Sequence, residues 1–458
     1  MTHKTLDERR AEGFEAAELV PLASHAEWAP DPMRADPVAL IAAQNETRVP
    51  WLVPVRHGRM QVSPFTFYRG TARIMAADLA TTQSSGLDVQ LVGDAHLSNF
   101  GVYASPERKL VFDANDFDET LAGPFEWDLK RLAASFMIAA QHLDLGKKTS
   151  RRVTMEVTEA YRQAVREFSL MGFLDLWYDH IAVDQVSRFS NLPRKEMNRR
   201  LEKFSQKAQK QTNLRALDKL AHRVDDQFRI RSQAPVLVPV RELLDEYEPE
   251  EIEQMILEAF EDYALSLRVD RRSLVERYRL VDYAVKVVGV GSVGTRCFVL
   301  LFEGRDDGDP LFLQAKEATA SVLEEHLGSS PFSQHGERIV HGQRQIQAQS
   351  DILLGWTRAR AGRDYYIRQL KDWKGAFDVE TATADTLAFY ARLCGYTLAR
   401  GHARSGDPAS IAAYLGDTDE FARAITAFSE KYAAQANDDY VTFRSAIDDG
   451  TIEAVTDE

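Results

Sequence analysis

The chain has 458 residues, of which 44% are hydrophobic, and this balance predicts a folded protein of two or three domains and excludes general disorder. Its formal net charge of −14 argues against a nucleic-acid-binding protein. The charged start, the absence of a bilayer-spanning apolar run and the presence of only two cysteines lead us to expect a cytoplasmic protein without a membrane partner.

The first sixty residues are rich in Pro, Ala and charged side chains, and we expect an extension of short helices that wraps the body. An aromatic segment at 63–70 follows, and a helix is predicted from Thr71 to Thr82. Arg69 stands between them and is a candidate for contacting a phosphate or an anionic substrate. An ion pair with a nearby aspartate is an equal alternative.

A short strand predicted at 89–92 leads into a polar loop that contains Asp94 and Asn99. Phosphoryl transfer needs a carboxylate that positions the acceptor hydroxyl and metal ions held against the phosphates. We expect Asp94 to accept the proton of that hydroxyl, and the amide oxygen of Asn99 to bind Mg²⁺, which prefers hard oxygen ligands. His96 either orients Asp94 or packs against the loop backbone.

A second short strand, at 109–112, leads to a cluster of aspartates. Asp116 is the preferred metal ligand in this cluster, and Asp113 and Asp118 compete with it. Crowded carboxylates repel one another unless a cation lies nearby. The cluster therefore predicts a magnesium site shared with Asn99, whereas the alternative is an exposed turn that caps itself.

Helices are predicted over much of the next 150 residues. Apolar positions recur with helical spacing over 126–144, and Asp128 is expected to cap the start of this buried helix. Residues 150–280 also have a mainly helical pattern. Within them, a basic stretch from Pro193 to Arg223 is interpreted as a solvated helix face rather than a nucleic-acid or lipid patch.

The pattern changes near Tyr283, where β-branched and apolar runs alternate with Gly and Asp. The predicted order is strand, strand, strand, helix, strand, strand, which is the order of the small lobe of a protein kinase. The strands are expected at 284–288, 295–302, 310–315, 352–358 and 364–370, with the helix at 338–350. A further helix is predicted at 383–403, and more helices follow it.

A glycine-rich loop, with Gly289, Gly291, Ser292 and Gly294, joins the first two of these strands. Such a segment also occurs in dinucleotide-binding Rossmann units, where a helix follows directly. The residues after Gly294 are β-rich instead, which favours the strand–loop–strand arrangement of kinases, whose loop amides cover phosphates. A Rossmann oxidoreductase stays an alternative that a helix after Gly294 would support.

Lys316, on the third strand, is expected to bind the α- and β-phosphates of ATP. It needs an acidic partner from the helix that follows, and Glu337 is preferred over Glu324 and Glu325. The adenine ring is expected to meet backbone groups at the end of the fifth strand, at Gln369 and Leu370.

These segments resemble the bacterial proteins described as domain of unknown function 2252, which look like distant relatives of aminoglycoside phosphotransferases and protein kinases. The resemblance covers nearly the whole chain and rests on 63–70, 93–101, 115–120, 126–132 and 401–407. By resemblance to the phosphotransferases, Asp94 is the catalytic aspartate, Asn99 and Asp116 bind the metal, and Lys316 binds phosphate.

In ordinary kinases the glycine loop precedes the catalytic loop, and here it follows. The expected architecture is therefore an α+β, two-lobed, protein-kinase-like fold in circularly permuted order, with a small antiparallel-sheet lobe and a large helical lobe. Its expected parts are an extension (1–60), the large lobe (61–280), the small nucleotide-binding lobe (281–378) and C-terminal helices that complete the large lobe (379–458). Alternatively, 402–407 is the catalytic loop in conventional order, with Asp407 as the base.

The predicted activity is ATP- and Mg²⁺-dependent transfer of phosphate to a hydroxyl of a small molecule or protein. One alternative is transfer of AMP, with the nucleotide bound the other way round. Another is a nucleotide-binding module of the same fold that has no catalytic activity.

Overall fold

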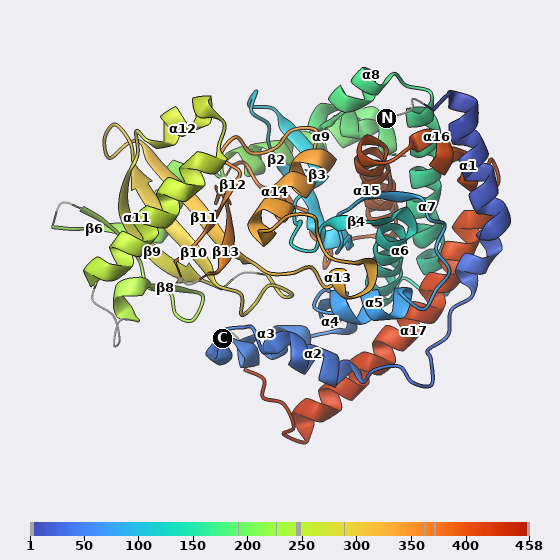
Figure 1. The fold of residues 1–458 in the computed structure, drawn as a ribbon, viewed down its shortest axis with the longest axis horizontal. Helices are drawn as coiled ribbons and strands as arrows, with labels where there is room; N and C mark the ends of the chain where they lie inside the picture. The colour runs from blue at the N-terminus through green and yellow to red at the C-terminus, as the bar shows by residue number, and fades with distance from the viewer. Residues whose placement is uncertain are drawn as a thin grey trace.

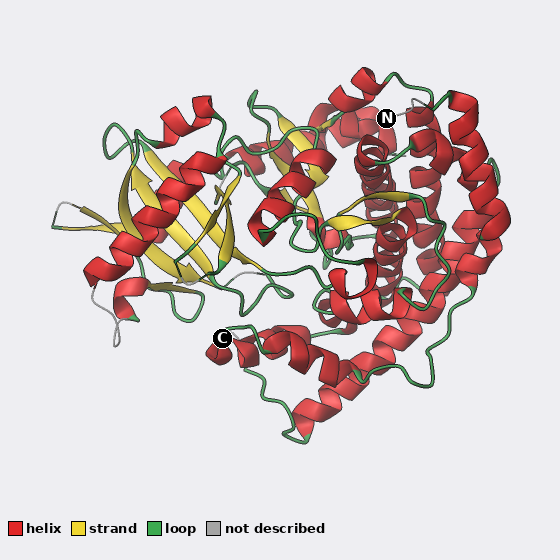
Figure 2. Cartoon of the chain, in the orientation of Figure 1, coloured by secondary structure: helices red, strands yellow, loops and turns green. Residues whose placement is uncertain are grey.

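The computed structural model describes residues 4–455, apart from 191, 226, 244–248, 288, 361 and 371. It shows a mixed α/β protein in which a body built around an antiparallel sheet lies beside a body built mainly of helices (Figure 1). Figure 2 shows that helices also cover the sheet body. The expected combination of helices with antiparallel sheets is confirmed.

Six antiparallel strands form the main sheet, in the spatial order β12-β13-β11-β10-β9-β8. The strands are β8 (Leu237–Pro239), β9 (Arg279–Lys286), β10 (Cys297–Glu303), β11 (Pro310–Ala318), β12 (Gly355–Arg358) and β13 (Asp364–Gln369). The five strands expected after Tyr283 are present, and α14 (His335–Ile346) follows the third, as expected. β8 was not predicted, because three residues are too few to show a period of two.

Helices from before the predicted lobe boundary cover both faces of this sheet. On one face, α11 (Pro249–Ser266) and α12 (Val269–Val275) pack their apolar side chains against β10, β11 and β13. On the other face, α10 (Asn213–Leu220) packs together with the β6–β7 hairpin. The sheet body therefore also includes α10, the β6–β7 hairpin, β8, α11 and α12, which precede residue 281 and which we had expected in the large helical lobe.

The helical body has one large core, to which α6, α7, α15 and α17 contribute. The contact between α15 and α7 is close because Gly395 has no side chain: a Cβ at this position would lie 2.3 Å from the Val157 carbonyl oxygen. The helices of this body are α4 (Pro64–Tyr68), α5 (Ala72–Leu79), α6 (Phe125–His142), α7 (Lys147–Ser169), α8 (Phe173–Tyr178), α9 (Arg194–Gln209), α15 (Ala384–Ser405), α16 (Pro408–Leu415) and α17 (Glu420–Asp448).

Two small sheets lie where the two bodies meet, and both lead into the polar loops. One is a four-stranded sheet in the order β14-β2-β3-β5, and the other pairs β1 with β4. Their strands are β1 (Asp88–Leu91), β2 (Phe100–Ala104), β3 (Leu110–Ala114), β4 (Leu121–Pro124), β5 (Ile181–Ala182) and β14 (Gly375–Ala376), and the remaining hairpin is β6 (Ala221–Val224) with β7 (Gln227–Ile230).

The N-terminal segment lies along the outside of the helical body, where α1 packs on α16. Gly13 permits this contact, because a Cβ there would lie 2.1 Å from the Ser410 carbonyl oxygen. The segment contains α1 (Leu6–Leu19), α2 (Pro37–Asn45) and α3 (Val53–Met60). Among the described residues, no helix combines the length and apolar character needed to cross a membrane.

Candidate active site

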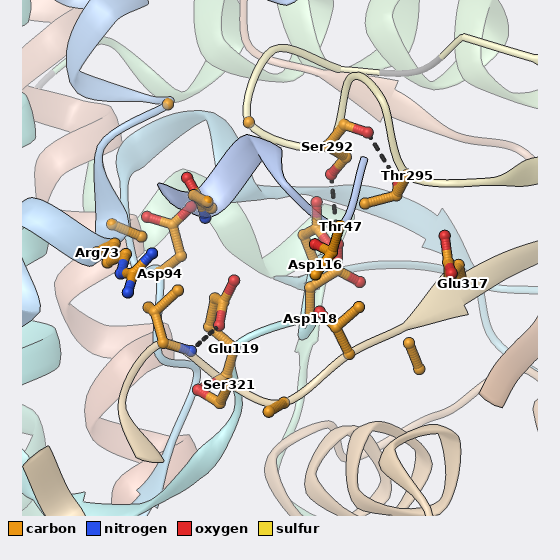
Figure 3. A pocket seen from close by; sticks show the side chains of 18 of the residues that line it. Thr47, Arg73, Asp94, Asp116, Asp118, Glu119, Ser292, Thr295, Glu317 and Ser321 are labelled. Atoms are coloured by element: carbon orange, nitrogen blue, oxygen red, sulfur yellow. Dashed lines mark hydrogen bonds between the residues drawn. The ribbon is translucent and has the colours of Figure 1, made fainter. Parts of the chain in front are cut away.

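A cavity of about 490 Å³ lies where the two bodies and the N-terminal segment meet. Figure 3 shows carboxylates from several segments that converge on it. Seven of the predicted site residues line it: Arg69, Asp94, Asn99, Asp116, Asp118, Gly291 and Ser292. Thr47, Arg48, Arg73, Glu119, Glu317 and Ser321 line it as well.

The loop that carries Asp94 is fixed by a buried carboxylate of α6. The two oxygens of Asp128 accept hydrogen bonds from the Val92 and Gly93 amides, at 2.6 and 2.9 Å. Gly93 has a φ of +89°, and a Cβ there would lie 2.1 Å from the Glu119 carbonyl oxygen, so only glycine fits. The prediction that Asp128 caps its own helix was wrong, because the N-cap position belongs to Pro124.

Asp94 is held by Arg131, whose Nε donates to Oδ1 at 2.9 Å. Burial raises the pKa of Asp94, although the neighbouring Arg131 and Arg69 oppose the rise. His96 lies with Nε2 at 3.7 Å from Asp94 Oδ2. Burial, together with Arg69 and Arg131, lowers the pKa of His96 well below its usual value, so its imidazole is neutral beside the carboxylate.

Asn99 and Asp116 have oxygen atoms suited to a cation. Asn99 Nδ2 donates to the Asp94 carbonyl oxygen at 2.9 Å, which leaves its amide oxygen available to a ligand. Asp116 Oδ1 is buried and has no hydrogen-bond partner in the described part of the chain, and it lies 3.6 Å from Lys316 Nζ. Burial and the nearby Asp118 raise the pKa of Asp116, against the effect of Lys316.

Protein side chains alone do not complete a metal centre. No group of three or more His, Cys, Asp or Glu side chains within the described ranges is arranged to hold an ion. Asp113, one of the competing candidates, forms a buried ion pair with Arg400 and does not line the cavity. Any cation would therefore depend on Asn99, Asp116, Asp118 and oxygen atoms of a bound ligand.

Lys316 pairs with aspartates from the loop after β3. Its Nζ forms a short ion pair with Asp118 Oδ2. The Tyr366 hydroxyl donates to Asp118 Oδ1 at 2.9 Å, and the Ser292 hydroxyl lies 3.3 Å from Asp118 Oδ2. Burial alone would raise the pKa of Asp118, but Lys316 and Tyr366 lower it, and Asp116 and Asp118 in turn raise the pKa of Lys316.

Glu337 is not the partner that the structure gives to Lys316. It lies on α14 and pairs with His341, one helical turn on, at 3.8 Å. The side chain of α14 that reaches the loop is Arg338, which donates to the carbonyl oxygens of Asp118, Thr120 and Thr319. Through Arg338, α14 therefore supports the aspartate loop by binding its backbone carbonyl oxygens.

The two rival acids have other partners as well. Glu324 accepts a hydrogen bond from the Ser321 amide, and Glu325 forms an ion pair with Arg73.

The glycine-rich loop is followed by strand β10 and not by a helix, so the Rossmann alternative was wrong. Gly291 and Ser292 line the cavity, and Gly289 and Gly294 shape the loop with φ values of +67° and +93°. The N-terminal segment binds three carbonyl oxygens of this loop. Arg59 Nη1 donates to Gly289 at 2.6 Å, the Val49 amide to Gly294 at 2.8 Å, and Arg48 Nη1 to Val293.

Gln369 and Leu370, expected to meet adenine, do not line this cavity. The Gln369 amide donates to Asp351 at 2.7 Å, and the Leu370 amide donates to the Phe312 carbonyl oxygen at 2.9 Å. The Leu370 side chain belongs to the core formed with α10. Both backbone amides are therefore already hydrogen-bonded within the protein, and α10 covers this part of the sheet.

The alternative loop at 402–407 has structural roles. Asp407 accepts from the Ala409 amide at 2.9 Å and caps α16. His402 is fully buried, and its two ring nitrogens contact Asp128 at 3.1 Å and the Tyr161 hydroxyl at 2.8 Å. Neither residue lines the cavity, so this segment does not supply its base.

Sequence reasoning gave no site role to Glu119, Arg131 or Arg48, and it assigned Asp128 to a helix cap. Glu119 is adjacent to a predicted ligand, and Arg131 and Asp128 lie within a segment that carried the family resemblance, so local signals existed for these three. Arg48 lies in the N-terminal segment, and its charge alone gave no signal.

The fold and the cavity define a mixed α/β protein with an acidic site between a glycine-loop sheet and a helical body. The chain belongs to a family described as uncharacterized proteins conserved in bacteria (DUF2252), whose family model matches residues 48–446. No curated protein and no solved structure is significantly similar to it.

Proposed function

We propose that the protein is an ATP- and Mg²⁺-dependent phosphotransferase that acts on a hydroxyl group of a small molecule or protein. The observation that carries the proposal is the convergence of Asp94, Asn99 and Asp116 on one cavity. Lys316, from the opposite body, forms ion pairs with Asp116 and with the neighbouring Asp118, which also lines the cavity. Positioned carboxylates, metal ligands and a phosphate-binding lysine are the parts that phosphoryl transfer requires.

In this proposal Asp94 accepts the proton of the acceptor hydroxyl. Arg131 holds its carboxylate in place, the neutral His96 lies beside it, and Asp128 fixes the loop beneath it. The pKa of Asp94 is raised towards neutral pH, which makes its carboxylate a stronger base than that of an exposed aspartate.

The residues present fit a magnesium ion. Asp116 has a buried oxygen without a hydrogen-bond partner among the described residues, and Asn99 presents an amide oxygen beside it. Bound Mg²⁺ would neutralise phosphate charge. Lys316 neutralises Asp118 in the free protein and would exchange part of this contact for phosphate oxygens.

The order of elements supports a kinase-like, circularly permuted interpretation. The Asp94 loop is followed by β2 and β3 and then by the aspartate loop, while the glycine loop and Lys316 come later, on β9 to β11. The elements β9, β10, β11, α14, β12 and β13 have the order expected for a kinase small lobe, with one additional short helix, α13 (Glu324–Leu327), before α14.

One observation favours AMP transfer as a second candidate. The sheet face beyond Lys316 is filled by Arg368, which donates to the Asn115 carbonyl oxygen at 2.9 Å, and by the core around α10. An adenine base that cannot enter beneath Leu370 would lie elsewhere in the cavity, with the nucleotide bound the other way round. The α-phosphate rather than the γ-phosphate would then lie nearer Asp94.

The test uses ATP labelled on either the γ- or the α-phosphate, incubated with Mg²⁺ and a panel of hydroxyl acceptors that includes the protein itself. Phosphate transfer moves only the γ-label, whereas AMP transfer moves only the α-label. Asp94→Ala should reduce turnover by at least about a hundredfold, the contribution typical of a general base, and spare nucleotide binding measured by calorimetry. Asp407→Ala is the control, because it changes a helix cap outside the cavity.

Unchanged turnover in Asp94→Ala would remove the catalytic assignment. Tight ATP binding by the unaltered protein, without transfer of either label, would instead favour a nucleotide-binding module.

A further inference from the structure

Two arginines on the glycine-loop side of the cavity belong to segments outside the glycine loop and the Lys316 strand, and only one of them, Arg69, was a predicted candidate for contacting an anion. Arg48 lies between α2 and α3, and Arg69 directly follows α4. Both line the cavity. They lie against the glycine loop: a Cβ on Gly294 would be 3.0 Å from Arg48 Cβ, and one on Gly291 would be 2.9 Å from the Arg69 carbonyl oxygen.

Neither guanidinium is neutralised by a direct ion pair with a described carboxylate. Arg48 is only 8% exposed, and its Nε has no hydrogen-bond partner in the described part of the chain. The Nε of Arg69 is buried and lacks a partner within the same residues. A buried donor without an acceptor destabilises the free protein, and more so when it is charged.

The other arginines at the site differ in this respect. Arg131 is bound to Asp94, and Arg73 pairs with Glu325 at 3.1 Å. Arg48 and Arg69 therefore stand out as cations with donors still available beside a cavity. Phosphate oxygens match the planar fork of a guanidinium group, which makes an anion of this class the ligand that fits.

The positions of the two arginines indicate which phosphate they would meet. The charges nearest Arg69 include Asp94 and Asp116, and those nearest Arg48 include Glu119 and Asp118. Burial lowers the pKa of Arg48 to about 10, which still leaves it charged at neutral pH. A phosphate between them would lie beside the proposed base, on the side of the glycine loop.

We infer that Arg48 and Arg69 form a subsite for the terminal phosphate of a bound nucleoside triphosphate. The inference rests on the proposed phosphotransferase function. In phosphoryl transfer, negative charge spreads over the equatorial oxygens of the transferred group, and two guanidinium groups would stabilise it there. The subsite also distinguishes a triphosphate from a diphosphate, because only the triphosphate carries the group that reaches it.

The experiment measures ATP and ADP affinities by calorimetry in the presence of Mg²⁺, for the unaltered protein and for Arg48→Met and Arg69→Met. Methionine keeps an unbranched apolar stem and removes the charged guanidinium group. Each variant should bind ATP at least about tenfold more weakly, because it loses charge-assisted hydrogen bonds to the terminal phosphate, and it should bind ADP with a change below about twofold. Arg108→Met is the matched control, because Arg108 pairs with Asp372 outside the acidic cavity, and it should leave the ratio of the two affinities unchanged.

Equal weakening of ATP and ADP, or no weakening of either, would overturn the subsite while leaving the proposed function in place. Failure of the unaltered protein to bind either nucleotide would overturn both. Arg48 also supports the Val293 carbonyl oxygen, so Arg48→Met could lower stability. If it fails to fold, Arg69→Met decides the matter alone, because its side chain makes no hydrogen bond or ion pair with a described residue.

Discussion

Besides its aspartates, the cavity is lined by Glu119, whose carboxylate titrates near neutral pH. Burial raises its pKa to about 7, and Asp118 and Asp94 add to the rise, although a hydrogen bond from the Val322 amide and the charge of Arg338 oppose it. In the free protein at neutral pH, Glu119 is therefore partly protonated, whereas Asp118, paired with Lys316, is ionised.

This raised pKa gives stability a predictable pH dependence. The folded state holds the Glu119 proton more tightly than the unfolded chain, whose glutamate has a pKa of 4.5, so the unfolding free energy falls as pH rises between 4.5 and about 7. One pKa unit corresponds to about 1.4 kcal/mol, which sets an upper limit of roughly 3 kcal/mol for this loss. Glu119→Gln should remove this contribution, so the difference in stability between about pH 5 and about pH 8 should shrink.

The measurement is urea unfolding of both proteins, without divalent cations, across that pH range. Parallel stability curves for Glu119→Gln and the unaltered protein would contradict the assignment.

For single residues, the sequence was informative wherever the position of a site residue is set by the short loop that contains it. Asp94 and Asn99 were predictable because five residues separate them on one turn after a strand. The partner of Lys316 was not, since it depends on how two distant segments dock. The local pattern favoured a helix acid, Glu337, but the docking presents Asp118 instead.

Among the elements, the pair α6 and α15 supports the Asp94 loop through one buried carboxylate. Asp128 on α6 binds the Val92 and Gly93 amides and His402 on α15. Asp128→Ala should destabilise the protein by about 2–4 kcal/mol, because it leaves two buried amide donors unpaired. It should also reduce turnover, because the loop that carries the proposed base loses its support.

The control is Asp407→Ala, which removes a helix cap near the surface and should cost about 1 kcal/mol without affecting the Asp94 loop. Denaturant unfolding of both variants gives the comparison. Similar losses of stability in the two would argue against a special role for Asp128.

The strands after Tyr283 were predictable as elements because alternating apolar residues mark a sheet face, whereas the membership of α10, α11 and α12 in the sheet body was not. An amphipathic helix shows that it packs on something, but its sequence does not identify the surface that receives it. Their apolar faces cover the sheet, so the sheet body is larger than the predicted lobe.

For the whole molecule, the proposed ligand should act as a link between the two bodies. Mg²⁺ with a non-hydrolysable ATP analogue binds only the folded protein in this proposal, so it should raise the unfolding free energy by about 2.7 kcal/mol at a hundred times its dissociation constant. Asp116→Asn should lose most of this gain at the same ligand concentration, and removing the metal with a chelator should abolish it.

Thermal unfolding with and without ligand is the measurement. Asp372→Asn is the control, because this acid pairs with Arg108 at 2.6 Å outside the acidic cavity. A full ligand effect in Asp116→Asn would exclude that residue from the cation site.

The attachment of the glycine loop to the N-terminal segment affects the direction of its peptide dipoles. Donors from Arg59, Arg48 and Val49 occupy three loop carbonyl oxygens. Within a planar peptide unit the N–H points opposite to the C=O, so fixing the Val293 oxygen also fixes the direction of the Gly294 amide. Loop oxygens that would repel an anion are thereby already hydrogen-bonded before any ligand arrives, and the polarity of the loop is set by a part of the chain more than two hundred residues away.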